Sequence, residues 1–386
     1  MTIGIVLSKP PKYSETFFNS KIKGLQQSGY KVVLFVQENP DAYNLCKVIC
    51  APKVSKNRVL QVILYGYVLL KLLPFFNRVS TFISLEKKRN RSTIQWLKNL
   101  YTNAHIITSH LDWLHFGFAT MALQSESVAK TINAKSAVSV RGFDVDVFPV
   151  KYPNCYKVLW ESIDKLHAIS NYTYRKALAS GLSKAVPFQI ITPAIDHTKF
   201  EVTSDVLRDD FKFVTIARLH WIKGLDYTLE ALSLLKKEGV DFQYTIIGEG
   251  QELEQLKFAV YQLQLEDRVR FVGQKAPEDV VTYLSEASVY IQYSDSEGFC
   301  NAVLEAQAMG LLCVVSDADG LKENVIDEKT GVVVPKRQPQ LLAKAIKNLL
   351  LLPNEMKQHM RTNAQRRVAE QFNLEKQQKE FLEFYE

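Results

Sequence analysis

Glu297 and Glu305 flank a short segment whose residue types suit sugar or phosphate binding. The segment, Gly298–Ala302, follows the apolar run Val289–Gln292 and precedes a helical pattern, so we expect a turn from strand to helix. Glycine lets the backbone approach a ligand closely, and free N–H groups at a helix start attract phosphate or sugar oxygens. The two carboxylates can accept hydrogen bonds from ribose or hexose hydroxyls. Taken alone, such a pair is more typical of a charge near a helix start and a solvated side chain.

Arg218 and Lys223 lie five residues apart after another apolar run, Lys212–Ala217. In a loop at that position the two cations can converge on a diphosphate, because arginine offers planar paired donors and lysine a compact charge. The alternative is a pair of exposed surface cations. Two cations and two acids together form a candidate site for a phosphorylated sugar.

Paired carboxylates also serve glycoside hydrolases, which hold them about 5–9.5 Å apart across one bond. Along a continuous helix, residues eight positions apart are separated by roughly 12 Å. A turn at Gly298 can change that separation for Glu297 and Glu305. The spacing and the neighbouring cations therefore make hydrolysis the weaker interpretation without removing it.

Short β-branched runs alternate with amphipathic helical patterns in both halves of the chain, which is typical of βαβ units and parallel sheets. The strands expected in the first half are Ile3–Leu7, Lys31–Val36, His105–Thr108, Ala137–Val140 and Lys165–Ile169. Those expected in the second half are Lys212–Ala217, Gln243–Ile247, Val269–Val272, Val289–Gln292 and Cys313–Ser316. The helices expected are Glu15–Ser28, Leu225–Lys237, Glu252–Leu263, Pro277–Glu286 and Ala302–Met309.

The periodic patterns break between Thr192 and Asp210, where proline, aspartate, threonine and serine concentrate. We therefore predict an α/β protein with two domains, 1–195 and 205–372, followed by a polar helix over 373–386. Each domain is expected to be doubly wound and Rossmann-like, and the two are expected to face each other across a cleft. Ligands of such sheets bind at the carboxyl ends of the strands.

The segment Glu297–Gly310 resembles the Glu-x7-Glu signature of retaining GT-B glycosyltransferases of family GT4. Other motifs of that family occur in the same order along the chain. They are Ala217–Gly224 (its Arg…Lys-Gly donor loop), Ile246–Gly250, Val269–Gly273 and Thr330–Val334 in the second half, and Tyr13–Phe17 and Ser139–Asp144 in the first. The resemblance is strong across roughly 212–350 and patchy before Ser170.

The resemblance implies a role for each candidate residue. Arg218 and Lys223 stabilise the leaving nucleoside diphosphate in place of a metal, so no metal and no other cofactor are expected. Glu305 binds the ribose hydroxyls, and Glu297 holds the donor sugar. The donor-binding residues expected beside Glu305 are Gly298, Phe299, Cys300, Asn301, Ala302, Gly248 and Gly273. The first domain then binds the acceptor, and the helix over 373–386 packs back onto it.

Arg141 follows the run Ala137–Val140, at a position where many family members carry histidine. Arginine is a poor proton acceptor, which argues against a general base here. It fits a front-face mechanism in which the leaving phosphate takes the acceptor's proton. The alternative is an ion pair with Asp144 or Asp146.

Three further residues are candidates for the acceptor side of the cleft: Asp144, Glu15 and His110. Glu15 follows Ser14, a good N-cap residue, so helix capping explains this position equally well. His110 is chosen because it ends the strand-like run that begins at His105.

The chain has 386 residues and a formal net charge of +7, so an anionic partner suits it. The strongest motif is acidic and glycine-turned, which argues against nucleic acid. Five cysteines, among them Cys46 and Cys50 without a second Cys or His pair nearby, indicate a reduced, cytoplasmic compartment rather than disulfides or a zinc site. Met1–Leu7 has the pattern of a first strand rather than a signal peptide.

The segment Val59–Phe76 is apolar and aromatic, and basic residues lie on both sides of it. This composition is typical of an interfacial membrane anchor, although a core helix beside a solvated charged face fits equally well. Lys71 and Pro74 interrupt the run, so no 18 uncharged apolar residues are consecutive. With an anchor here, the protein lies on the anionic inner face of the cytoplasmic membrane and takes a glycan or lipid-linked acceptor.

We therefore expect a retaining glycosyltransferase that moves a sugar from a nucleoside-diphosphate sugar to a hydroxyl acceptor. Surface polysaccharide, lipopolysaccharide or glycolipid biosynthesis is the expected setting. The alternatives are a GT-B sugar-phosphate epimerase or phosphorylase, and a non-catalytic basic module that binds membranes. No motif for a phosphorylase's basic phosphate cluster or pyridoxal-bearing lysine is present.

Overall fold

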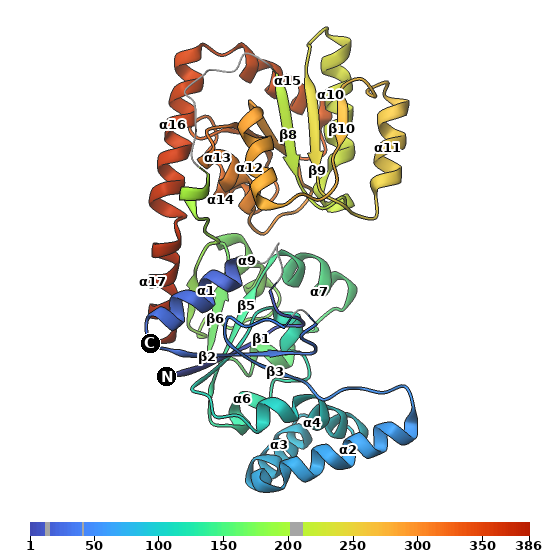
Figure 1. Cartoon of the computed structure of the whole chain (residues 1–386), viewed down its shortest axis with the longest axis vertical. Coiled ribbons are helices and arrows are strands. Elements are labelled where there is room, and N and C mark those ends of the chain that lie inside the picture. Colours follow the sequence, from blue (N-terminus) through green and yellow to red (C-terminus); the bar gives the residue numbers. More distant parts are fainter. Residues whose placement is uncertain (12–15, 41, 201–210) are drawn as a thin grey trace. The chain divides into compact units, whose positions relative to one another are not determined.

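A computed structural model of the protein describes residues 1–11, 16–40, 42–200 and 211–386. They divide into two compact units: Met1–Ile191 with Gln378–Glu386, and Thr192–Gln377. Figure 1 colours the chain from blue to red in sequence order, so the red end of the chain returns to the unit that holds the blue strands. The division between the units falls at Ile191, four residues before the expected limit of the first domain.

Unit 1 contains a parallel sheet of seven strands in the described residues, in the order β3-β2-β1-β4-β5-β6-β7. The strands are β1 (Thr2–Val6), β2 (Lys31–Val36), β3 (Lys47–Cys50), β4 (Trp113–Phe116), β5 (Lys135–Val140), β6 (Lys165–Ala168) and β7 (Phe188–Ile190). The order reverses direction between β1 and β4. The loops that follow these two strands therefore separate and leave a crevice at the carboxyl edge, where ligands of such sheets bind.

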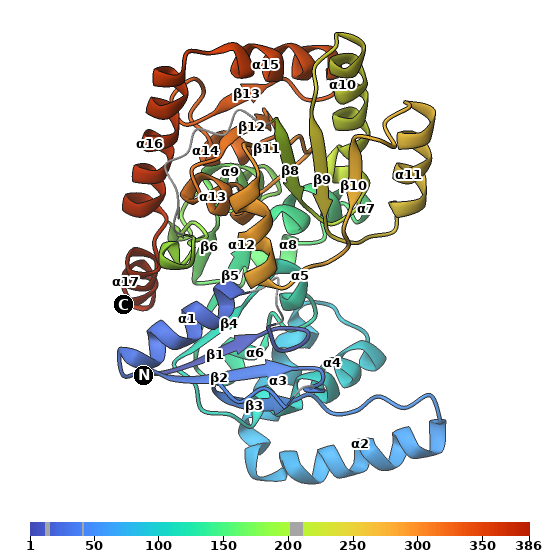
Figure 2. The ribbon, with the colours of Figure 1, turned by 45° about the horizontal axis from the view of Figure 1, so that its top comes forward.

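Helices cover both faces of this sheet. They are α1 (Thr16–Gln27), α2 (Arg58–Leu72), α3 (Phe76–Lys88), α4 (Thr93–Ile107), α5 (Ala119–Ala122), α6 (Val128–Thr131), α7 (Phe148–Lys151), α8 (Lys157–Trp160), α9 (Asn171–Ala179) and the end of α17 (Leu374–Tyr385). One core cluster joins α2–α6, α8 and α9 to the sheet, and a second joins α1 and the last residues of α17 to the other face. Figure 2 shows α2 as the outermost helix beyond β3.

The last residues of the chain are bonded into unit 1. The indole Nε1 of Trp113 donates a hydrogen bond of 3.0 Å to the carbonyl oxygen of Tyr385. The Tyr385 hydroxyl lies 2.6 Å from Nδ1 of the buried His115. The rings of Phe381 and Phe384 are buried beside them. This end of α17 is therefore part of the core of unit 1.

Unit 2 contains six described parallel strands in the order β10-β9-β8-β11-β12-β13. The strands are β8 (Lys212–Ile216), β9 (Gln243–Ile247), β10 (Val269–Phe271), β11 (Val289–Gln292), β12 (Leu312–Ser316) and β13 (Val332–Val334). The direction of winding reverses between β8 and β11, which pair directly through Val289 and Phe213. The residues after β8 and β11 therefore flank the crevice of this sheet.

The helices of unit 2 form a layer on each face of the sheet. They are α10 (Leu225–Lys237), α11 (Leu253–Gln262), α12 (Pro277–Glu286), α13 (Asn301–Ala308), α14 (Leu321–Asn324), α15 (Pro339–Leu351) and α16 (Asn354–Gln371). One buried cluster holds α10, α11 and α15, and the other holds α12, α13 and α14. Neighbouring residues such as Phe213 and Val214 enter opposite clusters, which explains why the strands are apolar throughout. The expected doubly wound α/β architecture is confirmed for both units.

One expected strand is wrong. His105–Thr108 is not a strand: the run lies at the end of α4. Leu100, Ala104 and Ile107 are all buried, and this spacing of four and three residues places them on one face of a helix. A short apolar run has no periodicity of its own, so its sequence fits a strand as well as a helix end. The strand at this place in the sheet is β4, which begins at Trp113.

Candidate active site

The loops after β8 and β11 meet at the carboxyl edge of unit 2. The backbone N–H of Asp295 donates a hydrogen bond of 2.8 Å to the carbonyl oxygen of Ile222. One residue further along the first loop, the ammonium group of Lys223 forms an ion pair with the carboxylate of Glu297. Both side chains are largely buried, with 15% and 14% of their surface exposed. Two residues that are 74 positions apart in the chain therefore share one contact at the crevice.

Gly224 permits this close approach of the two loops. Its φ of 57° lies in the left-handed region, where residues with a side chain are strained. A Cβ atom at this position would lie only 2.2 Å from the carbonyl oxygen of Tyr293. Lys223 precedes this glycine in a short 3-10 turn, Trp221–Lys223, so the glycine sets where the lysine stands.

The charges around Lys223 hold its ammonium group protonated. Burial is the largest single effect and acts to lower the pKa of Lys223, but the charge of Glu297, its hydrogen bond to the ammonium group and the charge of Cys300 together outweigh it, so the pKa is raised above its ordinary value. The guanidinium of Arg218 acts on the same group in the lowering direction, which places a second cation beside it. Arg218 itself is exposed. The two cations are thus neighbours, one buried against an acid and one facing solvent.

The turn after β11 is held by residues that follow β12. The N–H of Gly320 donates to the carbonyl oxygen of Glu297 at 2.8 Å, and a Cβ on Gly320 would lie 2.0 Å from the carbonyl oxygen of Gly298. The amide side chain of Asn324 accepts from the N–H of Cys300 at 2.9 Å and donates to its carbonyl oxygen at 3.0 Å. The turn is therefore fixed in place before any ligand arrives.

The hydrogen bond between Cys300 and Asn324 corrects the expectation that Cys300 binds the donor through its backbone amide. The N–H of Cys300 already donates to Asn324, so it does not point at a sugar. The amides of Phe299 and Asn301, on either side of it, remain candidates at the start of α13. Ala302 lies in the first turn of that helix and is partly exposed. Gly298, Phe299 and Cys300 are all buried.

Glu305 lies in the second turn of α13 and is partly buried. Burial raises the pKa of its carboxyl from an ordinary value of 4.5 to about 7. Burial also raises the pKa of the Cys300 thiol to about 12, and the charges of Glu297 and Glu305 act in the same direction. Both acids are therefore close to Cys300, one on each side of the turn.

Gly248 and Gly273 follow β9 and β10 and are bonded to each other, with the N–H of Gly248 donating to the carbonyl oxygen of Gly273 at 2.9 Å. Gly248 has a φ of 139°, and a Cβ on it would lie 1.9 Å from the carbonyl oxygen of Ala217. Ala217 directly precedes Arg218. The structure thus shows these glycines bringing the loops together at the edge that carries Arg218.

Two residues that support this site, Asn324 and Arg337, are not predicted by the sequence patterns. Arg337 forms two hydrogen bonds of 3.0 Å with the carboxylate of Asp295, and the neighbouring Lys336 donates to the carbonyl oxygen of Asp295 at 2.8 Å. Both basic residues come shortly after β13. Basic residues directly after an apolar run are the pattern from which they could have been predicted as part of the site. Asn324 ends a four-residue helix and left no such signal.

In unit 1, Arg141 follows β5, and its guanidinium group lies against aromatic rings. Its guanidinium carbon lies 3.8 Å from the ring centre of Phe17, 5.1 Å from that of Phe18 and 5.4 Å from that of Phe118. Its backbone N–H donates to the carboxylate of Asp144 at 3.1 Å. Phe17 and Phe18 belong to α1, which follows β1, and Phe118 belongs to the loop after β4. Arg141 therefore lies at the crevice of this sheet.

Asp144 is not placed as expected for an acceptor ligand. It is fully buried, and its carboxylate accepts hydrogen bonds from the Thr120 N–H at 3.1 Å and the Thr120 hydroxyl at 3.2 Å, as well as from Arg141. Burial raises the pKa of Asp144 to about 6, against the effect of these bonds. Asp144 therefore positions the loop that carries Arg141 and does not face a ligand.

His110 does not lie where the sequence pattern predicts. It precedes β4, so it lies at the amino edge of the sheet, away from the carboxyl edge where the crevice is. Its Nδ1 is 3.0 Å from the guanidinium of Arg78 on α3. The error follows from the wrong strand over His105–Thr108. Glu15 lies outside the described residues, and so does Ser14.

Within the described residues, no three His, Cys, Asp or Glu side chains gather as a metal site would require. The five cysteines are free thiols. Cys46 is buried and Cys50 is exposed, so the two do not share an environment.

Residues 198–367, which include every candidate residue of unit 2, match the family model described as Glycosyl transferases group 1. The protein therefore contains a glycosyltransferase domain. It is 31% identical to the amylovoran biosynthesis glycosyltransferase AmsK of Erwinia amylovora over 239 residues, which cover 60% of this chain and 58% of AmsK. It is 26% identical to the putative colanic acid biosynthesis glycosyltransferase WcaL of Salmonella typhimurium over 97% of this chain and 96% of WcaL.

The fold of this glycosyltransferase is the GT-B fold. The crystal structure of Anabaena Alr3699/HepE in complex with UDP-glucose matches it with a TM-score of 0.74 and 14% identity, covering 99% of this chain and 98% of that one. Lys223, Glu297, Arg218 and Glu305 all lie within the residues that match the family model.

Proposed function

We propose that the enzyme transfers a sugar from a nucleoside-diphosphate sugar to a hydroxyl group, with retention of configuration at the anomeric carbon. The observation that carries the proposal is the contact between Lys223 and Glu297 at the reversal point of the unit 2 sheet. A cation for a diphosphate and an acid for a sugar hydroxyl stand there side by side. The UDP-glucose bound to HepE, a protein of the same fold, supports a donor of this class.

In this proposal Arg218 and Lys223 bind the diphosphate of the donor. Negative charge develops on the diphosphate as the bond to the sugar breaks, and fixed cations stabilise that charge more than the ground state. Lys223 is suited to this role because Glu297 keeps its pKa high, so it carries a full positive charge at neutral pH. No metal or other cofactor is required for this step.

Glu297 and Glu305 accept hydrogen bonds from hydroxyl groups of the donor. Glu297 is one residue before the glycine turn and holds the sugar, together with the amides of Phe299 and Asn301. Glu305, in the second turn of α13, binds the ribose. Its raised pKa reflects a dry environment, in which a hydrogen bond to a hydroxyl gains strength.

Retention is proposed through attack on the same face of the sugar that the diphosphate leaves. The bond between the anomeric carbon and the phosphate oxygen breaks, the acceptor oxygen bonds to that carbon, and the acceptor proton passes to the departing phosphate oxygen. Arg141 fits this route because a guanidinium stays protonated and cannot act as a base. Its guanidinium lies over the Phe17 ring, and in this proposal it orients the acceptor in unit 1.

A panel of nucleoside diphosphates and their sugars, scored by thermal shift and by slow donor hydrolysis, tests this proposal. At least one nucleotide sugar should stabilise the wild type and be hydrolysed, and Glu305→Ala should lose both effects. Glu254→Ala, an exposed acid on α11, is the matched control. An NMR assignment of the product's anomeric configuration tests retention. Release of an epimer or of a sugar 1-phosphate would favour the epimerase or phosphorylase alternative instead.

We further propose that the product belongs to a surface polysaccharide, a lipopolysaccharide or a glycolipid, made at the inner face of the cytoplasmic membrane. The names of AmsK and WcaL support a polysaccharide. A glycan or lipid-linked acceptor fits the apolar helix α2 of unit 1, whose outer face is exposed. Incubation of labelled donor with membranes of the source organism should place the label in the lipid or polysaccharide fraction. Label confined to free sugar would contradict this part of the proposal.

A further inference from the structure

Helix α2 of unit 1 is apolar on all sides, although only one side packs against the protein. Val68 and Leu72 face the core and are buried. The large apolar side chains left exposed on α2 and just beyond it are Val59, Leu60, Val62, Ile63, Tyr67, Leu69, Leu70, Leu73 and Phe76. A helix that is apolar all round is normally covered on every side, by protein or by lipid. Such a surface is rare on a soluble monomer.

The segment Arg58–Lys88 is long and apolar enough by composition to cross a membrane: it contains an 18-residue window with a mean hydropathy of 1.9, and only 11% of that window is buried. Its second half does not leave the protein, however. Helix α3 packs against α4 and α6, and Phe82 and Glu86 are fully buried. Glu86 is bonded there to Arg91 and to the side chains of Asn99 and Ser127. This packing suits a helix that lies on a membrane and not one that spans it.

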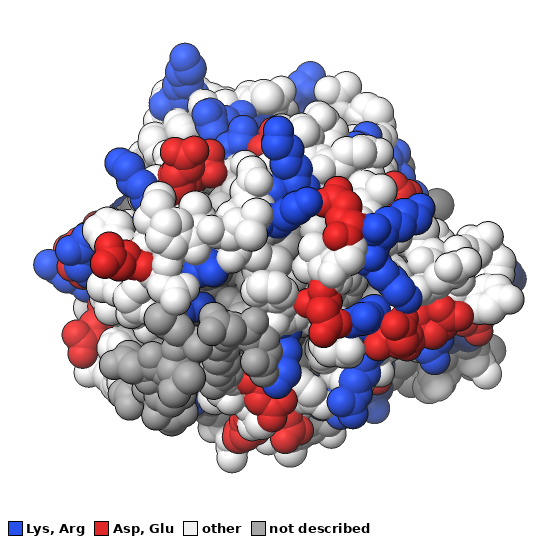
Figure 3. Space-filling model, turned by 90° about the horizontal axis from the view of Figure 1, so that it is seen from above, with Lys and Arg blue, Asp and Glu red and all other residues white. Residues whose placement is uncertain are grey.

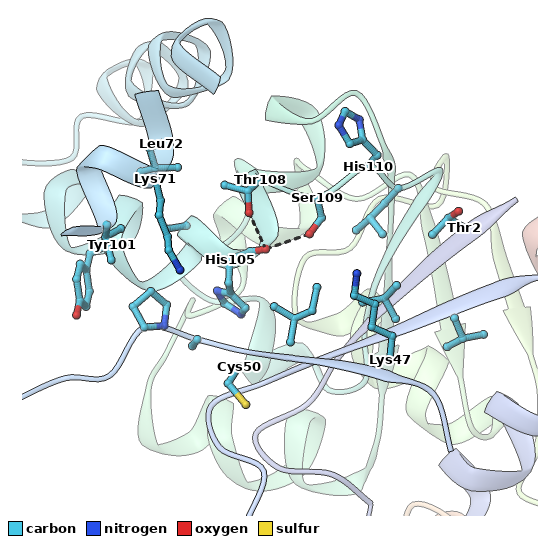
Figure 4. Close-up of a pocket in the computed structure, with 18 of the residues that line it drawn as sticks. Thr2, Lys47, Cys50, Lys71, Leu72, Tyr101, His105, Thr108, Ser109 and His110 are labelled. Atoms are coloured by element: carbon cyan, nitrogen blue, oxygen red, sulfur yellow. Dashed lines mark hydrogen bonds between the residues drawn. The ribbon is translucent and has the colours of Figure 1, made fainter. Parts of the chain in front are cut away.

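Directly beneath α2 lies a cavity of about 1040 Å³. Its walls come from α2, from α4 and from β2 and β3, at the amino edge of the sheet (Figure 4). Apolar residues such as Leu64, Val68 and Leu72 form the α2 side. The volume is at the upper end of the range for small-molecule sites, roughly 300–1,000 Å³. The cavity therefore has room for acyl chains.

The charges around this cavity are all of one sign. Lys31, Lys47, Lys53 and Lys71 line it, and no aspartate or glutamate does. None of these four lysines forms a salt bridge within the described residues. The whole stretch 42–85 contains no acidic residue. By contrast, basic and acidic side chains are intermingled on the face of the protein drawn in Figure 3.

The cavity wall holds a buried polar atom, Nδ1 of His105, which has no hydrogen bond of good geometry among the described residues. Burial lowers the pKa of this imidazole to about 4, so it is neutral at physiological pH. The backbone of Thr102 lies near enough to the imidazole to act on its pKa in the raising direction. Figure 4 shows Lys71 extending from α2 toward the His105 ring, with the Thr108 and Ser109 hydroxyls bonded to the His105 carbonyl. A ligand group that hydrogen-bonds to Nδ1 would complete the site.

We propose that this cavity binds a single molecule of an anionic membrane lipid. The acyl chains occupy the space between α2, α4 and the edge of the sheet, the phosphate lies among the four lysines, and the exposed face of α2 rests in the surrounding bilayer. The cavity is at the amino edge of the unit 1 sheet, whereas the crevice with Arg141 is at the carboxyl edge. The lipid is therefore a positioning ligand and not the sugar acceptor. The inference deepens the membrane part of the proposed function and does not depend on the donor chemistry.

The test uses dihexanoyl phosphatidylglycerol below its critical micelle concentration, titrated calorimetrically into the full-length protein. This probe is soluble, so it reports the cavity without a bilayer. We expect saturable binding with one site, and at least a tenfold loss of affinity in Lys47→Gln/Lys71→Gln and in Ala104→Phe, which fills the cavity. Leu64→Trp is a second filling variant, should Ala104→Phe not fold. The controls are Lys184→Gln, an exposed lysine beside β7, and Val62→Ser/Leu70→Ser on the outer face of α2; both should bind as the wild type does.

Three further arms separate the sources of binding. Glycerol 3-phosphate carries the anion without acyl chains, and dihexanoyl phosphatidylcholine carries the chains without a net charge; each should bind at least tenfold more weakly. Equal binding of either compound would overturn the proposal, as would binding that the filling variants leave unchanged. Loss of binding in the outer-face variant would also overturn it, because adsorption to α2 would then explain the signal. Donor hydrolysis in the wild type is measured in parallel, so failure of the lipid site and failure of the proposed transfer chemistry are seen separately.

Discussion

Lys223 and Glu297 form an ion pair although each follows a different strand of the unit 2 sheet. The pair joins the two loops where the direction of winding of the described six-stranded sheet reverses, between β8 and β11. In the proposed reaction a donor diphosphate competes with Glu297 for the lysine and frees the acid for the sugar. Binding of the donor then replaces the ion pair between Lys223 and Glu297 with contacts from each residue to the donor. The two loops do not have to come together first.

Replacing Lys223 should therefore affect catalysis more than binding. We expect Lys223→Ala to lower the turnover of the donor by about 10²–10³-fold, the usual effect of removing one group that stabilises developing negative charge. Steady-state kinetics with the donor found in the ligand panel measure this. Lys237→Ala, an exposed lysine at the end of α10, should be silent. Wild-type turnover in Lys223→Ala would remove Lys223 from the mechanism.

Glu305 should make the stability of unit 2 depend on pH. The unfolded carboxyl loses its proton near 4.5 and the folded one near 7. Between these pH values the folded state holds a proton that the unfolded state has lost, so stability falls as pH rises. Glu305→Gln has no such titration and should be more stable than the wild type at pH 8, by up to about 3 kcal/mol in free energy of unfolding.

Denaturant unfolding at pH 5 and pH 8, followed through Trp221 in unit 2, measures this difference. The wild type and Glu305→Gln should be alike at the lower pH and diverge at the higher one. A constant difference at both pH values would show that Glu305 does not titrate in this range.

Gly224 and Gly239 offer a matched pair for testing how the loop is built. Both have positive φ, 57° and 79°, but a Cβ on Gly224 meets the Tyr293 carbonyl at 2.2 Å, whereas nothing lies within 4 Å of a Cβ on Gly239. Gly239→Ala should cost about 1–2 kcal/mol from backbone strain alone. Gly224→Ala should cost clearly more and should also lower donor turnover, because the Lys223 loop must move.

Thermal unfolding and donor hydrolysis of Gly224→Ala and Gly239→Ala measure the losses of stability and of turnover. Equal losses of stability would show that the loop after β8 adjusts without displacing Tyr293. Unchanged turnover in Gly224→Ala would mean that the position of Lys223 tolerates that adjustment.

The exposed face of α2 should bind anionic vesicles. Each lysine or arginine near such a surface contributes about 1 kcal/mol, and salt screens this attraction. The wild type should sediment with vesicles of phosphatidylglycerol and phosphatidylcholine, less so in high salt. Val62→Ser/Leu70→Ser should bind them weakly. Equal recovery with neutral and anionic vesicles would contradict a role for the basic residues.

Most elements with a clear period were predictable from the sequence. The bounds of α10, α12 and β11 agree with the expected ones, because their apolar residues recur at helical spacing or form a run bounded by turn residues. The two loops that carry Arg218, Lys223 and Glu297 could be placed because they follow such runs. Their position at a common edge then follows from parallel pairing.

The features that were missed depend on contacts between distant residues. The bonds from Arg337 to Asp295 span 42 positions, and those from Asn324 to Cys300 span 24, and no local pattern announces either. The type and position of Asp144 predict a ligand of the acceptor, yet the fold shows that its carboxylate oxygens accept hydrogen bonds from Thr120 and Arg141. Periodicity likewise did not tell whether α2 would be covered.

The uncovered α2 has a practical consequence for anyone who isolates this enzyme. In buffer without amphiphiles, the nine apolar side chains of that surface have only each other to contact. Protein chains should then associate through this surface. Oligomers measured by gel filtration in such a buffer would reflect the absence of lipid and not the state of the enzyme at a membrane. Detergent or lipid nanodiscs should return the enzyme to single particles, and assembly states are best judged there.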